Sequence, residues 1–370
     1  MTDRPPAVAA DALVERSIEL LRFGQHASGA YVAAPTYPTY RFAWLRDGSF
    51  CAYAMDLVGQ HDSAAAFHGW VGATLDRHRD RVLDATAAAR DGADPDRMLP
   101  TRFTLDGEFE DAAGEQWPNF QLDGYGTWLW ALGRHVQSGR PLDPEVAQTA
   151  HVVTDYLQAA AHLPCYDCWE EFGDGHHTST LGAMAAGLRA AGNLLARPDA
   201  ARQADEIEAR LRTEHVRDGV LVKQLGDERV DASTLWLALP FEIFDLDDPV
   251  IVATADRIRS DLVRAGHGVT RYRGDTFYGG GAWILLTAWL AWFELATGDI
   301  DRAESRYRWI VETASPAGEL PEQLLTDPQA PDRIEPWTRF WGPVASPLLW
   351  SHAMFLVLDH HRRALAPRRG

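Results

Sequence analysis

The stretch Cys168-Trp169-Glu170-Glu171-Phe172-Gly173-Asp174-Gly175-His176-His177 leads into an alanine-rich apolar run that begins at Thr178. A tryptophan, two adjacent carboxylates and a glycine-rich loop therefore meet at a predicted helix start. Adjacent side chains on an extended loop point in different directions, so Glu170 and Glu171 can serve two different jobs at one cleft. The alternative is that both glutamates lie in the first turn of a helix and interact with its dipole. We expect the two histidines to make structural hydrogen bonds.

A second carboxylate lies far downstream, in Gly318-Glu319-Leu320-Pro321-Glu322-Gln323. Pro321 restricts the backbone before Glu322 and no apolar periodicity surrounds it, which predicts a loop. One carboxyl beside a large indole can be partly desolvated, which raises its pKa and lets it serve as a general acid. Two carboxylates on separate loops are the minimum for inverting glycoside hydrolysis, because one protonates the leaving oxygen and the other activates water.

The composition argues against several classes of partner. The 370 residues include 46% hydrophobic residues and 14 tryptophans, and the net charge is −18 with a pI near 5.1. This charge argues against nucleic acid and against an anionic membrane surface, and it favours a neutral substrate. Tryptophans in loops suit sugar binding, because an apolar sugar face stacks on an indole. Those within apolar helical runs are expected in the core.

No apolar segment near Met1 suggests a signal peptide, and no run approaches the length of a membrane span, so we expect a cytoplasmic protein. Three cysteines cannot all pair, which predicts reduced thiols. Cys165 and Cys168 form a lone C-x-x-C, and zinc needs two more ligands. No calcium-loop signature is present either, so we expect no metal and no cofactor.

Helical apolar spacing dominates the chain and predicts an all-α fold with only short, local strands. The predicted helices lie at about residues 10–23, 48–59, 62–79, 121–139, 144–160, 178–195, 199–213, 233–241, 248–260, 279–298, 301–313 and 346–365. The predicted strand positions are Met98–Thr104 and Gly219–Gln224.

The twelve predicted helices alternate between less and more polar. A double ring requires this alternation, because inner helices are buried on both sides and outer helices are amphipathic. We therefore predict an (α/α)6 barrel, a toroid of six helical hairpins, formed as one domain by residues 1–370. The loops that enter inner helices then gather at one end: Tyr40–Asp47, Trp117–Gly124, Cys168–Thr178, Arg271–Gly281 and Glu319–Gln323. Their convergence favours a functional pair of Glu170 and Glu322 at one cleft.

Six motifs in order resemble glycoside hydrolase family 15, which contains glucoamylases, glucodextranases, bacterial trehalases and isomaltose glucohydrolase. The motifs are Trp44-Leu45-Arg46-Asp47, Trp117-x-x-x-Gln121-x-Asp123-Gly124, Trp169-Glu170-Glu171, Arg271-Tyr272, Pro321-Glu322-Gln323, and Pro347 to Ala353 with Trp350. The resemblance covers roughly residues 10 to 360. It implies exo-acting hydrolysis with inversion, which releases β-glucose from a non-reducing end.

By position in these motifs, the resemblance implies that Glu170 is the general acid and Glu322 the general base. Tyr40 matches a tyrosine that lies close to the base and its water, or else it is an ordinary loop aromatic. The implied substrate contacts come from Arg46 and Asp47 (4- and 6-hydroxyls), Arg271 (2- and 3-hydroxyls), the Cys168 carbonyl, stacking Trp117 and Trp169, and Glu171 toward the next sugar. Gln121, Asp123, Tyr272, Gln323 and Trp350 complete the predicted substrate-binding set. The alternatives are a surface ion pair for Arg46 and Asp47 and a helix cap for Gln121 to Asp123.

The chain departs from the larger family members, because helix 1 begins almost at once and no segment suggests a β-sandwich or a starch-binding module. The predicted partner is therefore a small oligosaccharide. Among small-substrate members the layout is most similar to isomaltose glucohydrolase, which favours α-1,6-linked glucose. A trehalase or broader α-glucosidase is the first alternative. A non-catalytic carbohydrate sensor and an inverting hydrolase of β-linked or uronic sugars are the others. Inversion predicts carboxyl groups about 6.5–9.5 Å apart. The oligomeric state stays open.

Overall fold

The computed structural model describes residues 9–92, 95–109, 117 and 120–365. The expectation about a signal peptide near Met1 lies outside these residues. That all 370 residues form one domain also stays a prediction. Within the described part of the chain, no helix combines the length and the apolar character that crossing a membrane requires.

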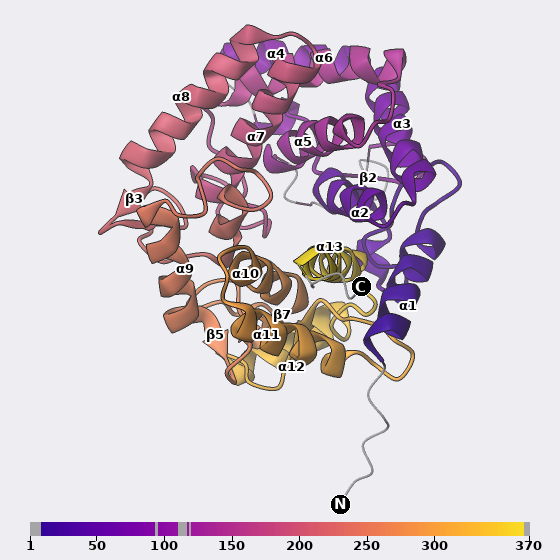
Figure 1. The fold of residues 1–370 in the computed structure, drawn as a ribbon. Coiled ribbons are helices and arrows are strands. Elements are labelled where there is room, and N and C mark those ends of the chain that lie inside the picture. Colours follow the sequence, from indigo (N-terminus) through magenta and orange to yellow (C-terminus); the bar gives the residue numbers. More distant parts are fainter. Residues whose placement is uncertain (1–8, 93–94, 110–116, 118–119, 366–370) are drawn as a thin grey trace, which may run out of the picture.

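Six helical segments form a closed inner ring, in which each packs on the next and the last returns to the first (Figure 1). In ring order they are α2 (Leu45–Leu57), α5 (Asp123–Gln137), α7 (Thr178–Leu194), the 3-10 helix η4 (Ala232–Leu237), α10 (Ile284–Ala296) and α13 (Leu349–Leu365). The sequence of α10, ILLTAWLAWFELA, is apolar all round, and all of its residues except Ala296 are buried. A helix of this kind needs neighbours on every side.

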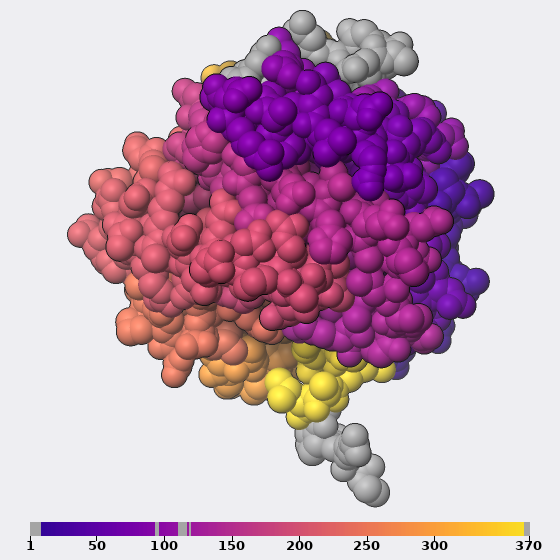
Figure 2. Space-filling model, turned by 90° about the horizontal axis from the view of Figure 1, so that it is seen from above, coloured from indigo at the N-terminus to yellow at the C-terminus, as the bar shows by residue number. Residues whose placement is uncertain are grey.

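The outer helices surround this ring and bury one stripe each. They are α1 (Ala10–Phe23), α3 (His61–Arg77), α4 (Arg79–Arg90), α6 (Pro144–Ala160), α8 (Pro198–Glu214), α9 (Pro249–Leu262) and α11 (Ile300–Thr313). In α8 only Ala200, Ala204, Ile207 and Leu211 are buried, and their spacing places them on one face. Side chains of α4, α6 and α8 close one side of the outer wall (Figure 2). The predicted (α/α)6 barrel is therefore confirmed.

Three predictions about helices need correction. Helix α4 and the short α12 (Ile334–Trp341) were not predicted, and α12 contributes Trp337 and Trp341 to the cavity described below. The segment 233–241 is a 3-10 helix that ends at Leu237, before the cis bond between Leu239 and Pro240. Asp231 starts η4 by accepting the backbone N–H of Ser233. The predicted starts at 279 and 346 are too early, because α10 begins at Ile284 and α13 at Leu349.

Short strands connect the helices at the end of the barrel that carries the predicted site. Strand β1 (Ala43–Trp44) pairs with β2 (Arg102–Phe103), and β3 (Val216–Arg217) pairs with β4 (Val220–Leu221). Strands β2 and β4 lie within the two predicted strand regions, whereas β1 and β3 were not predicted. A four-stranded antiparallel sheet was not predicted, and its strands are β5 (Val263–Arg264), β6 (Gly268–Val269), β7 (Ala282–Trp283) and β8 (Gln323–Leu324). In this sheet Trp283 faces Gln323, so Glu322 lies beside the start of α10, and its carbonyl accepts the N–H of Ile284.

Candidate active site

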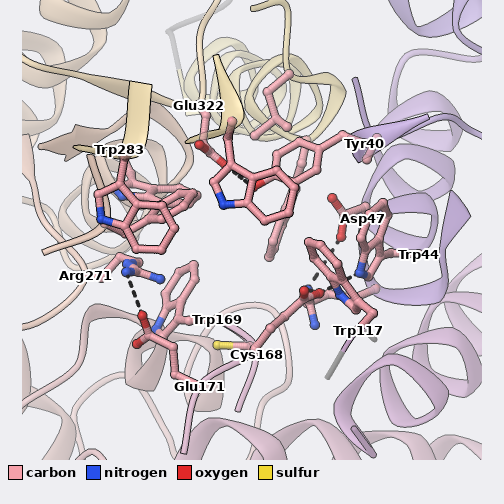
Figure 3. A pocket seen from close by; sticks show the side chains of 18 residues that line it. Tyr40, Trp44, Asp47, Trp117, Cys168, Trp169, Glu171, Arg271, Trp283 and Glu322 are labelled. Carbon is pink, nitrogen blue, oxygen red and sulfur yellow. Dashed lines mark hydrogen bonds and ion pairs between the residues drawn. The ribbon is translucent and has the colours of Figure 1, made fainter. Parts of the chain in front are cut away.

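The loops at this end of the ring enclose a cavity of about 300 Å³ (Figure 3). Eleven of the fifteen predicted site residues line it: Tyr40, Arg46, Asp47, Trp117, Cys168, Trp169, Glu170, Glu171, Arg271, Glu322 and Trp350. The other lining residues are Ala33, Trp44, Phe277, Trp283, Trp337, Trp341 and Leu348. Loops from distant parts of the chain therefore meet at one cavity, as the sequence predicts.

Glu170 lies on one wall of the cavity, on a turn of unusual backbone conformation. Its φ is +66°, a left-handed conformation that only glycine adopts without strain. The indole Nε1 of Trp44 donates to Glu170 Oε1 at 2.6 Å, and the Arg46 guanidinium lies 3.6 Å from the same oxygen. Burial raises the pKa of Glu170, and Arg46 and Trp44 oppose the rise without cancelling it. This carboxyl is therefore more easily protonated than one in water.

Polar groups on the side of the loop away from the cavity hold the loop that carries Glu170. The ring of His177 contacts the carbonyls of Cys165 and Phe172 at 2.9 and 3.0 Å, so this histidine makes the structural hydrogen bonds that were expected. The thiol of Cys168 lies 3.7 Å from Ser179 Oγ. In the described residues all three cysteines are free and buried, and no group of three His, Cys, Asp or Glu side chains could hold a metal ion.

Glu322 lies across the cavity, directly before β8, and is 3% exposed. The Tyr40 hydroxyl donates to Glu322 Oε1 at 3.1 Å, so the predicted neighbourhood of these two residues is present. Burial raises the pKa of Glu322 to about 8, against the opposing effects of Tyr40 and Arg271. Glu319 does not line the cavity.

Arg46 and Asp47 belong to the first turn of α2 rather than to the loop before it. Arg46 is buried and donates from Nη1 to Gln121 at 3.0 Å and to Asp123 at 2.9 Å. Neither of these two partners lines the cavity; both lie behind Arg46 and orient it. Burial raises the pKa of Asp47 to about 7, although Arg46 lies 3.6 Å away. The interpretation as a surface ion pair is thus wrong, because both side chains are buried.

Arg271 projects into the opposite side of the cavity and is held by two carboxylates (Figure 3). It donates from Nε and Nη2 to both oxygens of Asp275, at 2.8 and 2.5 Å, and from Nη2 to Glu171 at 3.1 Å. Such bidentate pairs fix the guanidinium plane. Tyr272 does not line the cavity; its hydroxyl donates to Glu171 at 2.5 Å. Gln323 does not line the cavity either; its side-chain Oε1 accepts the backbone N–H of Gly281. Asp275 was not among the predicted site residues.

Aromatic rings form most of the remaining wall. Trp337 and Trp341 come from α12 and close the cavity over Phe277 and Trp117, with ring centroids 5.1 and 6.2 Å apart, respectively. The prediction missed both tryptophans because α12 is only eight residues long and has no buried residue. The signal in IEPWTRFW was the spacing of Trp337, Phe340 and Trp341 at i, i+3 and i+4, which places aromatic side chains on one side of a helix. Flat apolar rings with carboxylates and guanidinium groups between them are the surface that a sugar requires.

The comparisons with known proteins agree with this geometry. The model of the family "Glycosyl hydrolases family 15" matches residues 7–318, a range that ends four residues before Glu322. The isomaltose glucohydrolase of Kribbella flavida is 43% identical over 365 residues, which cover 96% of this chain and 94% of the relative. A solved glycosidase in complex with glucose is 40% identical, with a TM-score of 0.91 and coverage of 95% of this chain and 97% of that chain. The glucoamylase of Saccharomycopsis fibuligera shares the fold at 15% identity, with a TM-score of 0.72 over 99% of each chain.

Proposed function

This chain belongs to glycosyl hydrolase family 15 and is a glycoside hydrolase, and on that premise we propose that it removes glucose from the non-reducing end of isomaltose or a related α-1,6-linked oligosaccharide. The observation that carries the choice of substrate is the similarity to an isomaltose glucohydrolase over almost the full length of both chains. A cavity of about 300 Å³ with aromatic walls is consistent with a small sugar.

In the proposed reaction Glu170 is the general acid and Glu322 the general base. The bond between C1 of the terminal glucose and the linking oxygen breaks, and that oxygen takes the proton of Glu170. A water molecule attacks C1 from the other face and gives its proton to Glu322, so that β-glucose is released from an α-glucoside. Exchange with solvent then returns both carboxyls to their starting state. A carboxyl separation of about 6.5–9.5 Å remains the expectation for this pathway.

The charged groups of the cavity suit sugar hydroxyls. In this proposal Arg46 and Asp47 hold the 4- and 6-hydroxyls, and Arg271 holds the 2- and 3-hydroxyls. Gln121 and Asp123 orient Arg46, and Asp275 orients Arg271, so these three act through their neighbours. Trp117 and Trp169 stack on sugar faces, and Glu171 faces the second sugar.

The reactive form has a single proton on the catalytic pair, placed on Glu170. Both carboxyls have pKa values raised by burial, and that of Glu322 reaches about 8. A singly protonated pair is then most abundant between two apparent pKa values that belong to the pair as a whole. Only part of this singly protonated population carries the proton on Glu170. The population falls off at both lower and higher pH, so kcat/KM should depend on pH as a bell-shaped curve.

Early-time proton NMR of the enzyme with isomaltose, maltose and trehalose together tests this function. Fresh β-glucose with loss of isomaltose is the expected result. Loss of trehalose would instead support the trehalase alternative, and loss of maltose as well a broader α-glucosidase. The appearance of α-glucose first would contradict inversion. Turnover of none of the three sugars would contradict the proposed substrate.

A further inference from the structure

Lys223 is the only lysine among the 35 basic residues of the chain, and the other 34 are arginines. It follows β4 and is 3% exposed, so it does not act as a surface charge. Its ammonium nitrogen donates to Asp167 Oδ2 at 2.6 Å and to Asp231 Oδ2 at 2.9 Å. An ammonium buried between two carboxylates is costly to desolvate, so such a cluster needs a reason.

The two carboxylates hold the loop that carries Glu170. Asp167 Oδ1 accepts the backbone N–H groups of Trp169 and Glu171, at 3.0 and 2.9 Å. The carbonyl of Asp167 accepts the N–H of Glu170 at 2.9 Å. Asp231 accepts the indole N–H of Trp169, at 2.9 Å to Oδ2. Three consecutive loop residues are therefore tied to the cluster of Asp167, Lys223 and Asp231.

This loop needs external support, because Glu170 and Phe172 both have positive φ, at +66° and +54°. Non-glycine residues in this conformation are strained and persist only where the surrounding structure holds them. Lys223 also lies 4.2 Å from the ring centre of Tyr272, whose hydroxyl binds Glu171. The contacts of one ammonium group thus extend to both glutamates of the loop.

We propose that Lys223 is a positioning residue for the general acid: by holding Asp167 and Asp231 together, it keeps Glu170 directed at the linking oxygen of the substrate. This inference rests on the proposed role of Glu170. It assigns Lys223 a place in the reaction although Lys223 does not line the cavity.

The geometry of the cluster explains why a lysine stands at this position while every other Lys or Arg position in the chain is an arginine. Two carboxylate oxygens converge on one nitrogen, which suits the compact ammonium of lysine and not the broad planar fork of arginine. Burial acts to raise the pKa of Asp167, and the charge of Lys223 holds it below its usual value instead. Without the ammonium, two buried carboxylates would face each other, and one of them would take up a proton or move away.

The substitution Lys223→Met tests the inference with two substrates, isomaltose and α-glucosyl fluoride. Fluoride leaves with little help from an acid, whereas the sugar oxygen of isomaltose needs its proton. We expect kcat for isomaltose to fall about 100-fold and kcat for the fluoride less than about 10-fold, since general acid catalysis contributes factors of this size. A folded variant in which both rates are unchanged, or fall together, overturns the proposal.

Arg306→Met is the matched control. Arg306 is a buried cation of α11 that donates to Glu294 at 2.7 Å, and neither residue lines the cavity. Loss of stability alone should then lower both rates equally, with no change in their ratio. Circular dichroism and Tm measurements on every variant show whether the fold is retained.

If Lys223→Met does not fold, the double variant Asp167→Asn/Lys223→Met keeps the net charge of the cluster, and the same ratio of rates decides. The wild-type enzyme distinguishes a failure of the proposed substrate from a failure of the proposed role of Lys223. If it cleaves the fluoride but not isomaltose, the proposed substrate is wrong. The ratio is then measured with whichever disaccharide the NMR experiment identifies.

Discussion

Tyr40 and Trp44 lie edge to face with ring centroids 5.7 Å apart, and each donates a hydrogen bond to a different one of the two proposed catalytic carboxylates. Tyr40 binds Glu322 and Trp44 binds Glu170. A segment of five residues thus contacts both the proposed acid and the proposed base. Because β1 pairs Trp44 with Arg102, this segment is anchored to the strand that follows α4. The segment from Tyr40 to Trp44 therefore helps to fix where the two carboxyls lie relative to each other.

The two carboxylates should respond differently to substitution. Glu170→Gln removes the proton donor, and we expect kcat for isomaltose to fall by about 100-fold or more while hydrolysis of α-glucosyl fluoride is largely spared. Glu322→Ala removes the base that activates water, so both substrates should lose at least as much. Steady-state kinetics with both substrates measure the difference. Equal, mild effects from both substitutions would contradict the assignment.

Tyr40→Phe should change the pH dependence of the reaction. The Tyr40 hydroxyl lowers the pKa of Glu322, so its removal raises that pKa further above about 8. A higher pKa moves the alkaline limb of the kcat/KM profile to higher pH. It also lowers kcat/KM, because less of the singly protonated pair has Glu322 ionised. The pH profiles of wild type and variant check this. A limb that stays in place or moves to lower pH counts against it.

Glucose affinity should depend on the ionisation of Asp47. Its pKa is raised to about 7, and the ionised carboxylate is the better acceptor for sugar hydroxyls. The ionised fraction grows as pH rises through 7, so we expect glucose to bind severalfold more tightly at pH 8 than at pH 6. Calorimetric titration at several pH values measures this slope. In Asp47→Asn the slope should be much reduced, and an unchanged slope would assign it to another group.

Trp341 on α12 should contribute to binding of the second sugar. Its side chain lines the cavity, and its ring centroid lies 6.2 Å from that of Trp117. Stacking of a sugar face on an indole is worth roughly 0.5–1.5 kcal/mol, by analogy with pairs of aromatic rings. Trp341→Ala should therefore raise KM for isomaltose about 10-fold and leave KM for α-glucosyl fluoride, which has no second sugar, nearly unchanged.

Phe340→Ala is the matched control for Trp341, because Phe340 is its neighbour on α12, is 73% exposed and does not line the cavity. This variant should leave both KM values unchanged. If it has the same effect as Trp341→Ala, the contribution comes from the stability of α12 and not from contact with the sugar.

The sequence determined those parts of the protein that depend on local pattern. The apolar circumference of α10 and the single buried stripe of α8 carry the signals of inner and outer helices, since burial on all sides or on one side is set by the residues of the helix itself. Glu170 could be singled out because it follows a tryptophan that can desolvate a carboxyl, and Glu322 because Pro321 restricts the backbone before it and predicts a loop.

Only the tertiary structure decided which polar residues reach the cavity and which stand behind it. Gln121 and Asp123 bind the back of Arg46, and Asp275 binds Arg271, because the direction of each side chain depends on the packing of a neighbouring loop. The two-residue strands of the four-stranded sheet have too little local pattern to predict. Their pairing is long-range, and it is this pairing that places Glu322 beside α10. The role of the single lysine also became visible only when residues 167, 223 and 231 were brought together, since contacts between distant segments are a property of the folded chain.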